Sequence, residues 1–175
     1  MASSRYLISS QVLASTASSV TFSSIPATFT DLCVKISARV DGTGSYGNYL
    51  DAQFNNDTSA LYSFTWIYGY GSDGPGSNRG SNQSNPYFGS SNSSVQTSNT
   101  FASIEIYIPS YTASQNKPIG VFSVNENNAT NNITTWSSAN LYRSTSAISS
   151  IKLYENGGSN FVTGSSFYLY GLKSS

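Results

Sequence analysis

The chain has 175 residues, of which 38% are hydrophobic and 14% aromatic, which is enough apolar surface for a folded core and excludes an intrinsically disordered chain. Only 9% of the residues are charged, eight of each sign, so the chain lacks the basic surface of a nucleic-acid-binding protein. A composition with so little charge favours a protein that functions within a larger assembly. The apolar runs fall short of the roughly 18 residues of a membrane span, and one cysteine without any histidine excludes an internal disulfide and an ordinary zinc site.

The first third of the chain predicts four strands, because apolar and polar residues alternate there. Residues 5–13 and 19–22 form the first two. The second is expected to end before Pro26, because proline cannot continue a central ladder. The clearest pattern covers residues 30–40 and is typical of a core strand in an antiparallel sheet with one solvated face. Its apolar face consists of Leu32, Val34, Ile36, Ala38 and Val40. After a Gly-containing turn, residues 49–54 predict the fourth strand.

The next segment, residues 61–70, is unusually aromatic. Its aromatic residues share one face of the predicted strand: Tyr62, Phe64, Trp66, Tyr68 and Tyr70. Aromatic rings on a β-face stack on sugar rings, and they also fill sandwich cores and subunit interfaces. The candidates for a glycan or partner contact are Trp66, Tyr68, Tyr70, Arg79 and Tyr87. We favour the alternative that the rings fill the core or an interface.

Residues 71–100 are rich in Gly, Ser and Asn and predict a long loop. A loop of this length inside a compact domain is usually either functional or mobile. Tyr87 and Phe88 are the exceptions in composition, and we interpret them as a short strand or an anchor on the core.

Strand patterns resume after residue 100. The segments 101–109, 119–124, 133–143 and 147–154 each predict a strand from their alternating or apolar composition. The last segment, 166–173, is apolar on both faces, so we expect it to be covered on both faces or to lie against a neighbouring subunit.

No segment shows the period of a helix over three turns. About eight to ten short strands separated by turn residues predict an all-β fold, in the form of a two-sheet antiparallel sandwich of the jelly-roll type. No linker divides the chain, so we expect one domain over residues 1–175.

The residues that could carry chemistry are few. The many serines lack a histidine partner, and Cys33 is best interpreted as a small strand residue rather than a reactive thiol. A glycosidase would need two carboxylates in one cleft, and the available acids are Asp31, Asp41, Asp51, Asp57, Asp73, Glu105, Glu126 and Glu155. Most of them fall at turns or on solvated strand faces. We therefore expect no enzyme, no metal site and no cofactor.

Four segments carry a resemblance to a known group of proteins: YLISSQ at residues 6–11, VTFSSIPATFTDL at 20–32, SIEIYIP at 103–109 and GSSFYLYGLK at 164–173. In these segments the chain resembles small β-sandwich structural proteins of tailed bacteriophages, which occur as capsid decoration or cement proteins, head fibres and tail-fibre tips. The similarity covers most of the chain except residues 71–100. It contains no catalytic motif, so no functional residue carries over.

The resemblance implies a non-enzymatic virion protein that packs on the capsid as a decoration, cement or head-fibre component. Its partners would be the major capsid protein or fibre subunits, in a homo-oligomer for which a trimer is one candidate. The alternative is the tip of a tail fibre that binds a receptor or glycan on the host surface. We expect no nucleic acid and no membrane as partners. Residues 1–5 do not lead into the continuous apolar core of a signal peptide, so synthesis in a host cytoplasm is expected before assembly into the virion.

Overall fold

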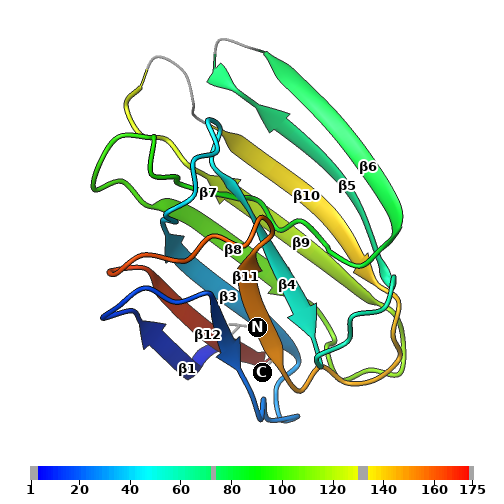
Figure 1. Ribbon diagram of the computed structural model, residues 1–175. Coiled ribbons are helices and arrows are strands. Elements are labelled where there is room, and N and C mark those ends of the chain that lie inside the picture. Colours follow the sequence, from blue (N-terminus) through cyan, green and yellow to red (C-terminus); the bar gives the residue numbers. More distant parts are fainter. Residues whose placement is uncertain (1–3, 72–73, 130–133, 174–175) are drawn as a thin grey trace.

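The computed structural model describes residues 4–71, 74–129 and 134–173 (Figure 1). These residues form twelve strands in two antiparallel sheets and no α-helix, which confirms the expected two-sheet sandwich. The large sheet contains, in spatial order, β1 (Ser4–Val12), β12 (Ser166–Lys173), β3 (Asp31–Ala38), β8 (Ala102–Ile108), β9 (Lys117–Val124), β10 (Thr135–Tyr142), β5 (Tyr62–Gly69) and β6 (Pro75–Gln83). The small sheet contains, in the same way, β2 (Ser19–Phe22), β11 (Ile151–Glu155), β4 (Asn48–Phe54) and β7 (Ser90–Ser91).

The strand order is that of a jelly roll with an extension. The first four strands alternate between the sheets, and β7 to β8 and β11 to β12 cross between them in the same way. The pairings β1·β12·β3·β8 and β2·β11·β4·β7 are those of an eight-stranded jelly roll. The hairpins β5–β6 and β9–β10 are inserted into this frame. They continue the large sheet beyond β8, and in Figure 1 this end of the sheet extends past the small sheet.

The main core lies between the small sheet and the facing part of the large sheet. We call the face of the large sheet that looks toward the small sheet its inner face, and the opposite one its outer face. On the inner face Val34 lies between Leu169 and Ile106 in register, and all three are buried. The small sheet contributes a matching apolar set: Val20, Phe22, Leu50, Ala52, Phe54, Ile151 and Leu153. The alternation predicted for residues 30–40 therefore fills the core as expected.

The prediction of one long loop over residues 71–100 is wrong in part. The structure places β6 at Pro75–Gln83 and the short β7 at Ser90–Ser91 inside this segment. Strand β6 is the edge of the large sheet, and most of its residues are exposed. An edge strand that is exposed on both faces has no apolar alternation, because it buries neither side. Phe88 is fully buried and acts as the predicted anchor.

The strand predicted over residues 147–154 begins later than expected, at Ile151. The backbone before it makes single hydrogen bonds instead of a continuous ladder: the N–H groups of Ile25 and Asn55 donate to the carbonyls of Ser149 and Ser150. The Asn55 Oδ1 atom accepts hydrogen bonds from the backbone N–H groups of Ser149 and Ser150, at 2.8 and 3.2 Å. The strand predicted over 133–143 is β10, and the predicted start at residue 133 lies outside the described residues.

Candidate functional site

The inner face of the sheet extension carries a cluster of aromatic rings. We call it the aromatic cluster, and it consists of Tyr46, Tyr49, Phe64, Trp66, Tyr68, Tyr70, Tyr87 and Trp136. Trp66 is central: its ring centroid lies 4.0 Å from that of Phe64 and 4.5 Å from that of Trp136. These three side chains are buried and form a second apolar core, with Tyr68 and Tyr87 packed against it.

Tyrosines continue the cluster toward the end of the extension. Tyr68 stacks on Tyr70 at 4.3 Å between centroids, and Tyr70 stacks on Tyr46 at 4.4 Å. The loop that holds Tyr46 is fixed by its carbonyl oxygen, which accepts hydrogen bonds from Ser90, Asn125 and Thr134. Burial raises the pKa of Tyr70 well above its ordinary value, so the Tyr70 hydroxyl is neutral at physiological pH.

The glycines of β6 make room for the rings of β5. Gly76 pairs with Tyr68 and Gly80 pairs with Phe64 across the two strands. A Cβ atom at Gly80 would lie 2.6 Å from Phe64 Cζ, and one at Gly76 would lie 2.4 Å from the end of the Tyr68 ring. The rings therefore lie flat over the backbone of the edge strand. From the sequence alone, glycines at these positions indicate a loop, although here they belong to a strand.

Tyr87 is held by an unusual backbone and a buried carboxylate. Its φ of 54° lies in the left-handed region, which a bulky residue adopts only when the surroundings enforce it. The Tyr87 N–H donates to Asp51 Oδ1 at 2.7 Å, and the next N–H, of Phe88, donates to the Leu50 carbonyl at 2.7 Å. These bonds fix segment 86–89 along β4 and point the Tyr87 ring into the cluster.

The sequence-predicted candidates are brought together only in part. Trp66, Tyr68, Tyr70 and Tyr87 all belong to the aromatic cluster. Arg79 pairs with Thr65 and therefore points to the outer face of the sheet, away from Trp66. Trp136 is a member of the cluster that the sequence does not single out, because the pairing of β10 with β5 that sets it beside Tyr68 is a tertiary feature.

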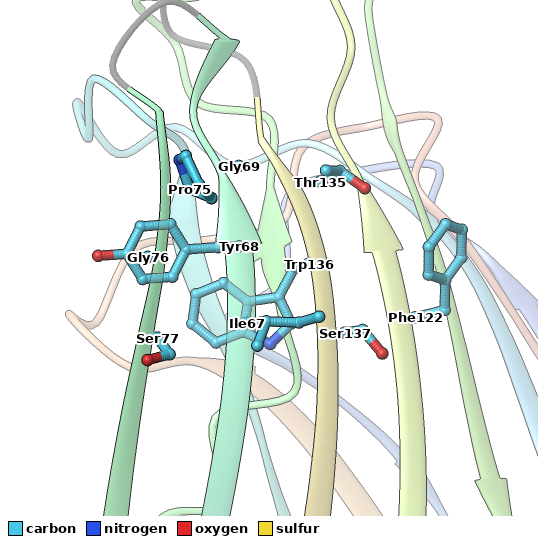
Figure 2. Close-up of a pocket in the computed structure, with 10 residues that line it drawn as sticks. All are labelled: Ile67, Tyr68, Gly69, Pro75, Gly76, Ser77, Phe122, Thr135, Trp136 and Ser137. Carbon is cyan, nitrogen blue, oxygen red and sulfur yellow. The ribbon is translucent and has the colours of Figure 1, made fainter.

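The outer face of the large sheet carries a second candidate surface. Figure 2 shows one part of it, an open hollow of about 660 Å³ that has Ile67 and Phe122 on either side of Ser137. These three residues lie in one row, because Ser137 pairs with Phe122 on one side and with Ile67 on the other. Ile67 is 63% exposed and Phe122 is 56% exposed. Two strand spacings separate these side chains by about 9.6 Å, so small residues form the floor between two apolar walls.

The hollow continues across the sheet. A second hollow of about 270 Å³ shares Phe122 and Ser137 with the first and reaches Tyr107 over Gly120. Tyr107 donates to Asp31 Oδ2 at 2.7 Å, and burial together with this bond raises the pKa of Tyr107 to about 12. Lys35 and Glu105 neutralise each other through an ion pair of 2.6 Å. This face therefore alternates apolar ridges with grooves over small residues, and it adds little charge.

Two of the carboxylates lie in the interior of the protein. Asp51 and Glu155 are both buried, and each accepts two hydrogen bonds from neighbouring residues. Asp73 lies outside the described residues. Cys33 is buried, and burial raises the pKa of its thiol. In the part of the chain that the structure describes, no three His, Cys, Asp or Glu side chains gather where they could hold a metal ion.

Comparisons with known proteins add no relative. No family model, no curated protein and no solved structure matches this chain. A search of the described residues for a helix long and apolar enough to cross a membrane finds none. The features that bear on function are therefore the aromatic cluster and the outer face of the large sheet.

Proposed function

We propose that this protein is a non-enzymatic structural component of a tailed-bacteriophage particle. It packs on other virion proteins, such as the major capsid protein or fibre subunits, as a decoration, cement or head-fibre protein. The observation that carries the proposal is the outer face of the large sheet, where Ile67 and Phe122 stand exposed beside open apolar hollows. Exposed apolar side chains that border a hollow on a folded protein are typical of a surface that contacts another protein.

Charge and shape support the same function. The chain has no net charge, so crowded copies on a particle repel one another weakly. The ridges of large side chains and the grooves over Gly120 and Ser137 offer a neighbouring surface shape complementarity without charge. The jelly-roll order of eight of its strands is a frame that viral capsid proteins commonly use.

Mass spectrometry of gradient-purified particles tests this function, with particles from the phage whose genome encodes the chain. We expect the protein at a fixed ratio to the major capsid protein. The variant Ile67→Ser/Phe122→Ser should remain in the unbound fraction, whereas Val95→Ser, which changes an exposed apolar side chain on a loop, should still bind. Particles free of the protein would refute the proposal. Particles that bind the double variant equally well would refute the role of the outer face.

A second candidate function, the glycan-binding tip of a tail fibre, is favoured by one observation in the aromatic cluster. Tyr49, at 41% exposure, gives the cluster one open ring. Titration with host surface polysaccharide should then change tryptophan fluorescence, and Tyr49→Ala should abolish the change while Tyr107→Ala on the outer face should not. Unchanged fluorescence in the wild-type protein would rule this candidate out.

A further inference from the structure

The large sheet ends in β1 on one side and β6 on the other, and among the residues that the structure describes no strand pairs with the outer edge of either. Both strands contain nine residues, so each edge is about 30 Å long. Along such an edge every second residue points its N–H and C=O away from the sheet. Another extended strand can form hydrogen bonds with all of these groups, because its own backbone groups have the same spacing. The side chains decide which of the two edges accepts one.

Strand β6 carries several features that discourage pairing. It starts with Pro75, which lacks the N–H, and it carries the exposed charge of Arg79. Its register with β5 shifts between the partners of Tyr62 and Phe64. Prolines, charges and irregular registers are the devices by which edge strands avoid other chains. Its small side chains also offer no apolar surface to a partner.

Strand β1 carries almost none of these features. It contains no proline, and Arg5 is its only charged residue. Leu7 and Val12 point to the outer face and are 56% and 60% exposed. Its one register shift lies between Leu7 and Ser9, where Ile8 packs against the core. Strand β1 thus shares with β6 a single register shift, and it differs in having no proline and in exposing apolar side chains, which makes it the better site for strand addition.

The strand is also ordered in advance. Antiparallel pairing with β12 extends along its whole length, from Ser4 opposite Lys173 to Val12 opposite Ser166. On its inner side the Tyr6 ring lies 5.9 Å from that of Phe29, and Lys173 Nζ lies 5.8 Å from the Tyr6 ring. A partner therefore meets a preformed strand, and little conformational entropy is lost on pairing.

We propose that β1 pairs with β1 of a second copy of this chain, antiparallel and across a two-fold axis, so that the two large sheets become one continuous sheet. The second copy is the partner because it presents the same open edge, and one contact then satisfies the edges of both molecules. An antiparallel neighbour continues the pattern of the whole sheet. The two-fold axis also brings the apolar side chains of Leu7 and Val12 from both copies onto one face. The pairing depends on the proposed function in one respect alone, namely that it would serve as a contact between copies in the assembled particle.

Sedimentation velocity and amide hydrogen exchange of the full chain test this pairing. We expect a reversible dimer, and slower exchange of residues 4–12 at high than at low protein concentration, with β6 unchanged. Leu7→Lys/Val12→Lys should raise the dissociation constant at least about tenfold, because it sets like charges against each other across the axis. The matched control is Val95→Lys, since Val95 is 55% exposed and lies outside the sheet edges. It should dimerise like the wild type.

The melting temperature shows whether each variant is folded, and Ser10→Lys on the same strand replaces the double variant if that one unfolds. A protein that stays monomeric up to about 100 μM would overturn the proposal, as would a trimer without even-numbered species. A dimer that both lysine variants leave intact would overturn it as well. Whether the chain occurs in particles is measured separately, so the pairing can fail while the proposed function stands, and the reverse also holds.

Discussion

Asp51 is a buried carboxylate whose ionisation is coupled to the stability of the fold. Burial raises the pKa of Asp51 from the ordinary value of 3.8 to about 6; Glu155 also raises it, and the hydrogen bonds from Asn156 and the Tyr87 N–H lower it. The folded state therefore holds a proton between these pH values that the unfolded state has released. The contribution of Asp51 to the stability of the folded state is therefore fully present below about pH 4, and it is lost as the pH rises through about 6. The difference amounts to about 3 kcal/mol.

We predict that the free energy of unfolding falls by up to about 3 kcal/mol between pH 4 and pH 6.5 in the wild type. Asp51→Asn should show a flat profile over this window. Asp41 and Asp57 have pKa values held below the ordinary range by hydrogen bonds from Asn160 and Ser59, so their effects fall below pH 4. Urea unfolding at a series of pH values measures this. An equal pH slope in the wild type and in Asp51→Asn would contradict the assignment.

Lys117 is a second buried ionisable residue, and its partners are backbone carbonyls. Its side chain is fully buried, and Nζ donates to the carbonyls of Ala113 and Ser144, at 2.8 and 3.1 Å, and also to that of Gln115. The ammonium group thus joins the turn before β9 to the segment after β10.

Lys117→Met should reduce the free energy of unfolding by about 2–4 kcal/mol, because three carbonyls lose a charged donor. The control is Lys152→Met on β11, where the amino group faces the Tyr154 ring at 5.6 Å, and it should change stability by no more than about 0.5 kcal/mol. Denaturant unfolding compares the two variants. Similar losses in both would show that burial of the Lys117 amino group has no special role.

At the scale of elements, glycines in two strands have opposite roles. Gly80 in β6 lies under the Phe64 ring, whereas nothing lies within 4 Å of a Cβ atom placed at Gly120 in β9. Phe64 stacks on Trp66, so its ring cannot move aside without disturbing the aromatic cluster.

Gly80→Ala should therefore destabilise the protein by about 1–3 kcal/mol through overpacking. Gly120→Ala should leave it unchanged or stabilise it by up to about 1 kcal/mol, because glycine is unfavourable in a strand. The two melting temperatures give the answer, since the substitution is identical. If Gly80→Ala were the more stable variant, the flat packing of Phe64 over β6 would be wrong.

Arg39 organises the segment after β7. Its guanidinium donates to the carbonyls of Gln96, Thr97 and Thr100, at 3.0, 2.8 and 3.1 Å. Arg39→Met keeps the apolar stem but loses these donors, so hydrogen exchange of residues 93–100 should become faster while β3 and β8 stay protected. Unchanged exchange in 93–100 would mean that the backbone holds this segment without Arg39.

The elements that could be predicted from sequence are those that bury one face. Strand β8 alternates strictly and β3 does so except at the buried Cys33, and Val34 and Ile106 face the core as the pattern indicates. Strand β6 could not be predicted, since an edge buries neither face and its identity depends on pairing with β5. In the same way, the aromatic face of residues 61–70 was visible in the sequence, but the register that turns Arg79 away from Trp66 was not.

At the scale of the whole molecule, the two inserted hairpins define the surfaces that matter. They widen one sheet of the jelly roll beyond the other, so the aromatic cluster closes the uncovered inner side. The outer side of β9, β10 and β5 then remains open, with Phe122 and Ile67 exposed. A face of this kind is stable in water only at some cost, and contact with a neighbouring protein removes its apolar surface from solvent.

The central claim is that this outer face is covered in the assembled particle. Hydroxyl-radical footprinting of the free protein and of intact particles measures it directly. We predict that oxidation of Ile67, Tyr107 and Phe122 falls severalfold in the particle, while oxidation of Val95 on the loop stays the same. Equal oxidation of Ile67 and Phe122 in both samples would contradict the account.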